Sequence, residues 1–244
     1  MGEALVDSSI WVALTQIIII NILLSGDNAV VIALASRKLP LKQQKAAILF
    51  GSMGAIGLRI ILTFFAVMLL GVPYLKLAGG VLLLWIGARM LVEDEGEGEL
   101  HAHDHLWGAI RTIIIADFVM SLDNVIGVAA AAKGNVALLV IGLVISVPLI
   151  VYGSTLVLKL MRRFPVVITL GAALLGWVAG EMAVEDQSIV AWIEANAHYL
   201  HTLVPVMCAV MVVIAGKRMA SRTPMAAMHP TVELPPKAAP SEQR

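Results

Sequence analysis

Seven long apolar segments restrict what this chain can fold into. They lie at about residues 10–35, 46–71, 74–92, 107–132, 135–158, 165–183 and 199–216. Each is close to the ~20 residues that a helix needs to cross the ~30 Å hydrocarbon core of a bilayer. Hydrophobic residues make up 59% of the 244 residues and charged residues only 14%, which is too apolar for a soluble domain of this size. The sequence therefore predicts an all-α, polytopic membrane protein with seven transmembrane helices.

The basic residues between these segments predict how the chain lies in the membrane. Most of them follow segments 1, 5 and 7 or flank the loop after segment 3, whereas the opposite loops contain only Lys76 and Lys133. Short loops rich in Lys and Arg stay on the cytoplasmic side. We therefore expect the N-terminus outside and the C-terminus in the cytoplasm.

Three polar regions lie outside the predicted spans. The loop that ends in His101, His103 and His105 is acidic, and it is either simply solvated or collects metal at the cytoplasmic surface. Residues 185–200 place apolar side chains at helical spacing, which predicts a short amphipathic helix on the outer membrane surface. Residues 220–244 contain five prolines, so we expect a disordered cytoplasmic tail behind one membrane domain at 1–219.

A polar motif occurs twice inside the apolar segments. Its first copy is Asn21, Ser25, Asp27 and Asn28, and its second is Asp117, Ser121, Asp123 and Asn124, each 96 residues later. Segments 3 and 6 share Pro, Gly and Trp positions at an offset of 92, while segments 2 and 5 align poorly. Three helices per repeat is an odd number, so the two copies must cross the membrane in opposite directions. We therefore predict an inverted 3+3 repeat, at about 10–92 and 107–183, followed by a seventh helix at about 199–216.

Three of the motif residues are acids at membrane depth, where an ionised side chain costs roughly 3 kcal/mol on insertion scales. These acids, Asp27, Asp117 and Asp123, are accompanied by amide and hydroxyl oxygens and by no Cys or His. Ligand sets made only of oxygen suit hard divalent ions such as Mn²⁺, Ca²⁺ and Mg²⁺. Arg59, near the centre of segment 2, leaves the intramembrane charge net negative, which favours a cation over an anion.

Helix geometry governs how the motif residues can act together. Asn21, Ser25 and Asn28 share one helical stripe, and Asp27 lies about 100° from its neighbouring Asn on an ideal helix. A local break at Gly26 would bring Asp27 into the same cavity and free backbone carbonyls as ligands. The second copy has a leucine in place of that glycine and gives no such signal.

Several roles stay open at this point. Ser25 and Ser121 either line a cation path or only link helices by hydrogen bonds. Arg59 either pairs with an Asp until an ion displaces it, or forms a permanent structural ion pair. Carboxylates that exchange an ion for protons would supply antiport coupling. No P-loop, nucleophile elbow or HExxH is present, so neither an ATP-driven pump nor another enzyme is expected.

The stretches Leu24-Ser-Gly-Asp-Asn-Ala-Val-Val-Ile-Ala33 and Ala116-Asp-Phe-Val-Met-Ser-Leu-Asp-Asn-Val125 resemble the paired Asp-Asn motifs of the TerC family of integral membrane proteins. The resemblance covers about residues 8–218 and is to the short bacterial members. It implies an inverted three-helix repeat and manganese export across the bacterial inner membrane. By the same resemblance, Asp27, Asn28, Asp123 and Asn124 match the metal-binding residues, with Asp117 at the matching polar position.

The sequence and the resemblance together predict a secondary transporter that exports Mn²⁺, coupled to protons. Mn²⁺ is then a transported substrate and no cofactor is expected; the partners are the cation and the lipid bilayer, with no nucleic acid, and a homo-oligomer is left open. The residues alone do not rank Mn²⁺ against Ca²⁺. The alternatives are an exporter of a small organic solute such as an amino acid, and a non-transporting membrane partner in metal loading or tellurite resistance.

Overall fold

The protein is described by a computed structural model at residues 11, 14–19, 26–65, 68–69, 71–92, 102–132 and 135–222. Every regular element in these ranges is a helix and none is a strand, which confirms the all-α prediction. The helices with defined bounds are α2 (Gly26–Ser36), α3 (Leu41–Phe64), α5 (Leu75–Leu91), α6 (Ala102–Ala132), α7 (Val136–Arg163), α8 (Val166–Val184), α9 (Val190–Asn196) and α10 (Leu200–Arg222).

Five of these helices contain stretches long and apolar enough to cross a membrane, so the chain is an integral membrane protein with several apolar helices. The stretches are Leu41–Phe64, His105–Leu122, Val136–Arg163, Val166–Val184 and Leu200–Ser221. Helix α5, in the predicted third span, has 17 residues, and α2, in the predicted first span, has 11. The total of seven spans therefore stays a prediction.

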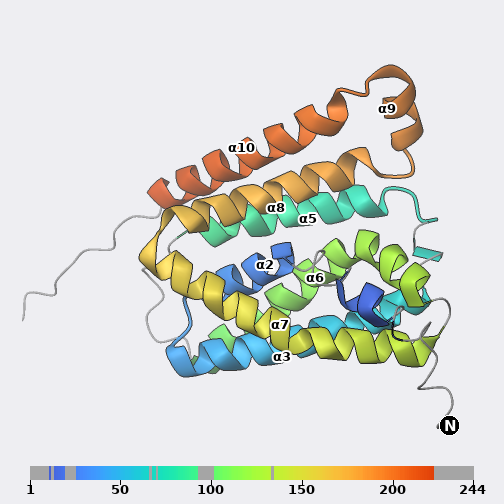
Figure 1. The fold of residues 1–244 in the computed structure, drawn as a ribbon. Coiled ribbons are helices and arrows are strands. Elements are labelled where there is room, and N and C mark those ends of the chain that lie inside the picture. Colours follow the sequence, from blue (N-terminus) through green and yellow to red (C-terminus); the bar gives the residue numbers. More distant parts are fainter. Residues whose placement is uncertain are drawn as a thin grey trace, which may run out of the picture.

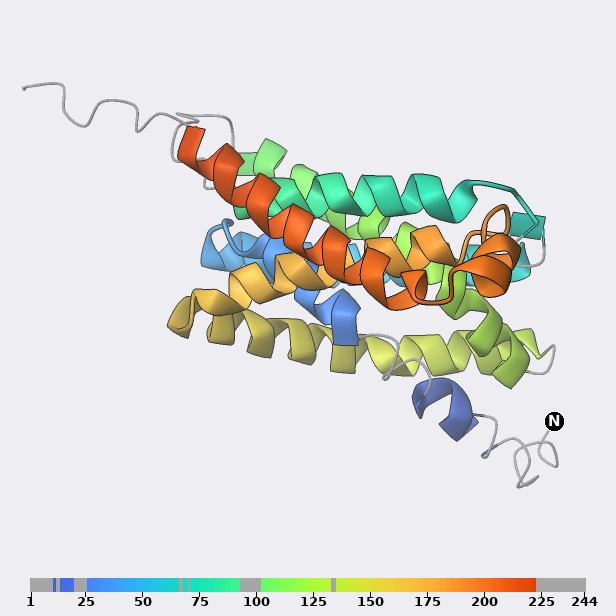
Figure 2. The ribbon, with the colours of Figure 1, turned by 90° about the horizontal axis from the view of Figure 1, so that it is seen from above.

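The helices run along a common direction in three layers (Figure 1). Helices α5, α8 and α10 pack on one another in one outer layer, and α3 and α7 pack together in the opposite one. Helices α2 and α6 lie between these layers. Figure 2 shows the same bundle from above. The central pair carries the described members of both polar motifs, which places them inside the bundle.

Glycines allow the outer layer of α5, α8 and α10 to pack closely. A Cβ on Gly80 would lie 2.7 Å from the Ala179 carbonyl oxygen, so α5 and α8 meet at the backbone. A Cβ on Gly176 would lie 2.6 Å from the Cys208 carbonyl oxygen, which brings α10 equally close to α8. Small residues permit such close approach between membrane helices, whose association depends on van der Waals packing.

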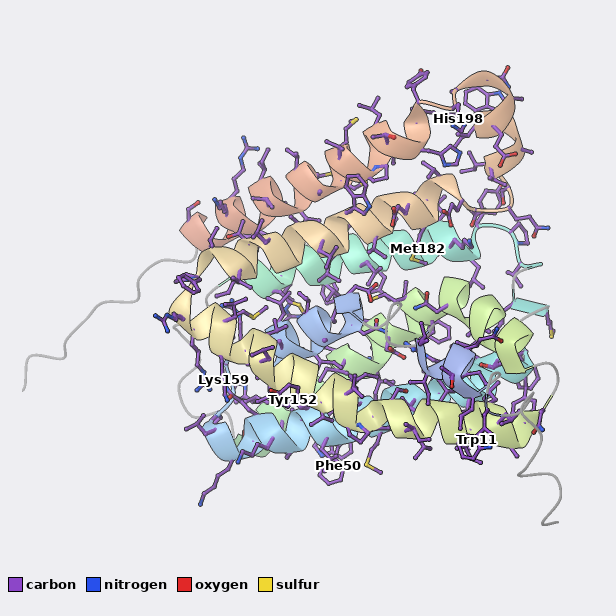
Figure 3. All side chains as sticks on the ribbon, viewed as in Figure 1. Trp11, Phe50, Tyr152, Lys159, Met182 and His198 are labelled. Atoms are coloured by element: carbon purple, nitrogen blue, oxygen red, sulfur yellow. The ribbon has the colours of Figure 1, made fainter. Side chains whose placement is uncertain are left out.

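Large apolar side chains cover the outside of the bundle. Phe50 on α3 is 56% exposed and points away from the helices (Figure 3), and Tyr152 on α7 is 73% exposed. In a membrane protein, such side chains face lipid tails, so their exposure agrees with the composition.

Two helices begin before the apolar segments that predicted them. Helix α3 begins at Leu41 after Pro40 and ends at Phe64, whereas the prediction was 46–71. Helix α6 begins at Ala102, so the prediction of a loop up to His105 was wrong at its end. In both cases the helix includes polar residues next to the apolar run, because helical hydrogen bonding does not stop where hydrophobicity does. The rest of that loop, 93–101, lies outside the described residues. The tail was predicted at 220–244, but residues 220–222 are the end of α10, and residues 223–244 lie outside the described residues.

The predicted amphipathic segment contains the short helix α9. Ile193 on this helix is 3% exposed, whereas the neighbouring Trp192 is 60% exposed. The helix therefore has one buried side and one free side, as its sequence pattern predicts. Its contact with a membrane surface stays a prediction.

Asp186, between α8 and α9, fixes the start of α5. Its carboxylate accepts hydrogen bonds from the backbone N–H groups of Tyr74 at 3.1 Å, Leu77 at 3.2 Å and Ser188 at 2.9 Å. Burial alone would raise the pKa of this carboxyl, but these bonds and one from the Ser188 hydroxyl outweigh it, so the pKa lies below its ordinary value. The ionised Asp186 thus supplies acceptors for N–H groups at the N-terminus of α5 that have no partner within the helix.

Replacing Asp186 with alanine is expected to lower the free energy of unfolding by about 1–2 kcal/mol, because the part-buried N–H groups of Leu77 and Ser188 lose their acceptor, while that of Tyr74 keeps the Ser188 hydroxyl. The folded-state pKa is below the unfolded value of about 3.9, so the contribution of Asp186 is present above pH 4 and falls away as the pH drops further. Unfolding of the purified protein in detergent at pH 7 and at pH 3 measures both effects. The difference between wild type and Asp186→Ala should shrink at pH 3; an equal difference at both values contradicts the role of the charge.

Candidate functional site

A buried ion pair joins α3 to α6 in the middle of the bundle. Arg59 Nη2 lies 2.6 Å from Asp117 Oδ1, and Arg59 Nε donates to Ser121 Oγ at 2.9 Å. Ser121 Oγ in turn donates to Asp117 Oδ2 at 3.1 Å. Arg59 is 1% exposed, Asp117 8% and Ser121 0%, so the three side chains are shielded from the surroundings. Asp117 and Ser121 meet the guanidinium together because residues four apart lie on the same helical face.

Asp27 lies on α2, near this pair. Its carboxylate accepts the Asn28 backbone N–H at 2.8 Å. It is only half-buried, whereas Asn28 is 3% exposed. Asp27 is close enough to Arg59 and Asp117 to interact with both charges.

The structure tests the predicted helix break at Gly26 only in part. Helix α2 begins at Gly26, while Asn21 and Ser25 lie outside the described residues. In the second copy α6 continues through Leu122 without interruption, as the leucine there suggested. The described residues therefore place the second copy within a helix, and the described part of the first copy on α2.

The remaining motif residues are placed less completely. Asn124 lies on α6, is half-buried and takes part in a polar interaction. Asp123 also lies on α6, but its side chain is outside the described set. The structure thus brings together Asp27, Arg59, Asp117 and Ser121. Among the side chains that are described, no three of the His, Cys, Asp and Glu type form a group able to hold a metal ion.

Ser52 is a buried polar residue that the sequence analysis did not single out. It lies on α3, is 1% exposed, and its hydroxyl makes no hydrogen bond within the described part of the chain. Ser52 precedes Arg59 by seven residues and so lies on the same face of α3. This seven-residue spacing from Arg59 is the feature of the sequence that could have identified Ser52.

Polar contacts also tie the helices together at the end of the bundle where α3 begins. Arg37 donates to the Met90 carbonyl at 2.8 Å, and Lys38 donates to the Val92 carbonyl at 2.6 Å, so the α2–α3 corner holds the C-terminal end of α5. Arg162 on α7 donates to the Gln44 side chain at 2.5 Å. Basic side chains near a helix C-terminus can donate hydrogen bonds to the last carbonyl groups, which have no partner within the helix.

A cavity of about 300 Å³ opens at the other end of the bundle, beside α9. Its lining includes Leu122, which is adjacent to Asp123, and the side chains of Lys76 and Glu185. Lys76 Nζ and a Glu185 carboxylate oxygen are 3.5 Å apart. The cavity therefore reaches α6 next to the second motif.

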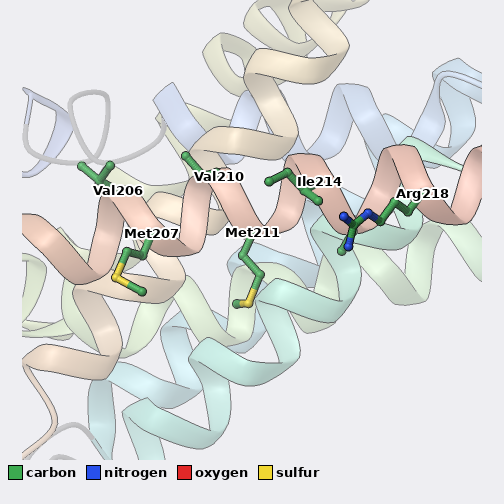
Figure 4. A pocket seen from close by; sticks show the side chains of 7 residues that line it. Val206, Met207, Val210, Met211, Ile214 and Arg218 are labelled. Atoms are coloured by element: carbon green, nitrogen blue, oxygen red, sulfur yellow. The ribbon is translucent and has the colours of Figure 1, made fainter.

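A second hollow follows the outer face of α10 and has a volume of about 460 Å³ (Figure 4). Its lining is apolar except for Arg218, and it is built from α10 alone. Nothing in it resembles a set of cation ligands, and it is separate from the Arg59–Asp117 pair. This hollow belongs to the apolar outside of the bundle.

Comparison with known proteins comes from sequence. A family model described as "Integral membrane protein TerC family" matches residues 6–224. The chain is 44% identical over 205 residues to "Uncharacterized membrane protein YjbE" of Bacillus subtilis (strain 168), covering 84% of this chain and 94% of that protein. It is 26% identical over 192 residues to "Uncharacterized membrane protein YceF" of the same organism, covering 75% and 74%. No solved structure matches the chain.

A third relative is much longer than this chain. "UPF0053 inner membrane protein YoaE" of Escherichia coli (strain K12) is 30% identical over 190 residues. The match covers 69% of this chain and 36% of that protein. This chain therefore corresponds to about a third of that relative's length.

Proposed function

Because the chain belongs to the TerC family of integral membrane proteins, we propose that it is a secondary transporter that exports a divalent cation, with Mn²⁺ as the first candidate, in exchange for protons. The observation that carries this proposal is the buried Arg59–Asp117 pair, with the half-buried Asp27 near enough to interact with both charges. Asp27 and Asp117 both interact with the charge of Arg59, so these three groups together carry a net charge of −1 when all are ionised, which favours a cation. Ionisable groups at membrane depth are costly and usually mark an ion path.

Arg59 acts in this proposal as a tethered cation. In the absence of a transported ion, its guanidinium neutralises Asp117 and keeps that buried carboxylate from standing alone. An arriving divalent ion competes with Arg59 for the Asp117 and Asp27 oxygens. The Ser121 hydroxyl moves together with the Asp117 carboxylate, because it donates a hydrogen bond to that carboxylate. Protons from the other side then replace the ion on the carboxylates, which couples the two movements.

The cation preference follows from the ligand atoms. The candidate ligands offer carboxylate, amide and hydroxyl oxygens and no sulfur or imidazole; they are Asp27, Asn28, Asp117, Asp123, Asn124 and Ser121. Such sets favour Mn²⁺, Ca²⁺ or Mg²⁺ over Zn²⁺. Mn²⁺ is placed first by the family resemblance.

The predicted inverted repeat is supported by a pair of matching contacts. A Cβ on Gly51 of α3 would lie 2.7 Å from Ile113 Cδ1, and a Cβ on Gly142 of α7 would lie 2.5 Å from Ile17 Cγ2. Ile17 and Ile113 are 96 residues apart, which is the offset of the two polar motifs. Each predicted half therefore inserts the same isoleucine against a glycine of the other half. Binding sites at the interface of such halves are typical of secondary transporters.

The location and orientation are also part of the proposal. We place the protein in the bacterial inner membrane, with the N-terminus outside and the C-terminus in the cytoplasm. The start of α3 and the end of α10 lie at the same end of the bundle, opposite α9 (Figure 1). Basic residues gather at that end, as the cytoplasmic side requires.

Ion flux into vesicles tests the proposal. Purified protein in liposomes should transport Mn²⁺, and an opposing proton gradient should accelerate the flux until a protonophore removes it. Asp27→Asn should reduce the Mn²⁺ flux by at least about tenfold, in line with losses at metal sites. Glu194→Gln, on the exposed side of α9, is the matched control and should transport as wild type does.

Three outcomes would contradict the proposal. Absence of flux for Mn²⁺, Ca²⁺ and Mg²⁺ alike would favour a non-transporting membrane partner. Flux of a labelled amino acid without any response to Mn²⁺ would favour a small-solute exporter. Equal flux in wild type and Asp27→Asn would show that the first motif does not take part.

A further inference from the structure

The Ser52 hydroxyl differs from the other buried serine hydroxyls in the helices. We propose that Ser52 Oγ is an additional ligand of the transported divalent cation, on the predicted cytoplasmic side of Asp117. This inference rests on the proposed function and names a residue outside both polar motifs. Neither polar motif predicts that Ser52 binds the cation.

Serines inside apolar helices normally bind to their own backbone. Ser36 donates to the Ile32 carbonyl at 2.6 Å, and Ser154 donates to the Ile150 carbonyl at 2.7 Å. Ser146 likewise binds a carbonyl three residues earlier. This bond satisfies the hydroxyl where no water can reach it.

Ser52 has the same burial but not the same bond. It is 1% exposed, and its Oγ has no hydrogen-bond partner among the described residues. A buried hydroxyl without a partner is unfavourable, so its persistence at this position needs an explanation. An oxygen ligand that is filled only when a cation is bound provides one.

The position of Ser52 fits that role. Gly51 and Gly54 bring α3 against Ile113 and Ile114 of α6, and a Cβ added at either glycine would lie 2.7 Å from the nearest isoleucine carbon. Ile113 precedes Asp117 by four residues, which is about one helical turn. Ser52 therefore lies about one turn before Asp117 and about two turns before Arg59, in the direction of the α3 N-terminus.

That direction is the predicted cytoplasmic side. A cation entering from the cytoplasm would reach Ser52 before it reaches the Arg59–Asp117 pair. A neutral hydroxyl oxygen can replace one water of a hard divalent ion without adding charge. Ser52 would then hold the ion next to Asp117 while the guanidinium leaves the carboxylate.

The test changes the ligand atom at Ser52 and compares it with a back-bonded serine. All proteins carry Cys208→Ser, so that an introduced thiol is the only one in the chain. Ser52→Ala removes the ligand and Ser52→Cys replaces oxygen by sulfur; Ser154→Ala and Ser154→Cys are the matched controls, because Ser154 is equally buried. The Kd for Mn²⁺ and for Cd²⁺ is measured on purified protein in detergent, with Mn²⁺ followed by electron paramagnetic resonance.

We expect Ser52→Ala to weaken Mn²⁺ binding roughly tenfold, the loss typical of one ligand-shell contact. Ser52→Cys should shift the preference for Cd²⁺ over Mn²⁺ by a similar factor, because sulfur favours the softer ion. Both Ser154 variants should keep the Mn²⁺ and Cd²⁺ affinities of the parent protein. A structural role alone would change unfolding and leave the Cd²⁺ to Mn²⁺ ratio constant.

The outcomes separate this inference from the proposed function. If the parent protein binds and transports Mn²⁺ while the Ser52 variants match the Ser154 variants, Ser52 is not a ligand and the proposed function stands. If the parent protein neither binds nor transports Mn²⁺, the proposed function fails and the Ser52 inference fails with it.

Discussion

Replacing Asp117 with alanine is expected to destabilise the protein by roughly 3–5 kcal/mol, the range for breaking a buried ion pair by removing one partner. The Arg59 guanidinium would keep Ser121 as a hydrogen-bond partner but lose the carboxylate at 2.6 Å. A buried cation that loses its hydrogen-bonded carboxylate is destabilised, so the packing of α3 against α6 should weaken. Unfolding in detergent measures the loss, and Mn²⁺ flux should fall to the level of empty vesicles.

A double variant separates stability from transport. Arg59→Met combined with Asp117→Leu removes both charges and leaves apolar side chains of similar size, which is often neutral or stabilising. We expect this variant to recover most of the lost stability while Mn²⁺ flux stays absent. Flux that returns with stability would show that the pair is only structural. Flux that survives in Asp117→Ala would remove Asp117 from the cation path.

Replacing Gly180 with valine is expected to cost about 3 kcal/mol, at the upper end of the range for overpacked interiors. A Cβ at this position would lie 2.5 Å from Pro205 Cα and 2.8 Å from Pro205 N. These are backbone atoms, so no rotamer change relieves the contact and α8 must move away from α10. The free energy of unfolding in detergent and the yield of monodisperse protein report the effect.

Gly57 on α3 provides the matched control. A Cβ there would meet nothing within 4 Å. Gly57→Ala should therefore leave the protein as stable as wild type or up to about 1 kcal/mol more stable, from the better helix propensity of alanine. Equal losses in Gly180→Val and Gly57→Ala would contradict the close contact between α8 and α10.

Much of the fold follows from apolar periodicity and length. The all-helical architecture and most helix centres were predictable, because a chain in lipid must satisfy its backbone hydrogen bonds within each segment. Helix ends were less predictable. Pro40 precedes α3 and marks its start, but the apolar run begins several residues later. Hydropathy indicates which residues lie in the hydrocarbon core of the bilayer, whereas the helix continues into the polar region beyond that core.

The candidate site was predictable as a set of residues but not as a set of contacts. The sequence shows Arg59 and several acids at membrane depth, and only the packing of α3 on α6 selects Asp117 as its partner. Asp186 was missed because two of the N–H groups that it binds, those of Tyr74 and Leu77 at the start of α5, are more than a hundred residues earlier. Ser52 was missed because sequence does not reveal which buried serine lacks a bond to its own helix.

The glycine contacts also divide the bundle by how its parts can move. Within the layer of α5, α8 and α10, Gly80, Gly176 and Gly180 face backbone atoms, so these helices cannot slide without opening gaps. Toward the centre, the same layer presents Gly79 to the Val119 side chain and Gly171 to the ends of aliphatic side chains on α2. Contacts of this kind slide by small rotamer changes, as in shear motions. Any alternation between the two sides of the membrane should therefore shift α2, α3, α6 and α7 along a rigid three-helix slab.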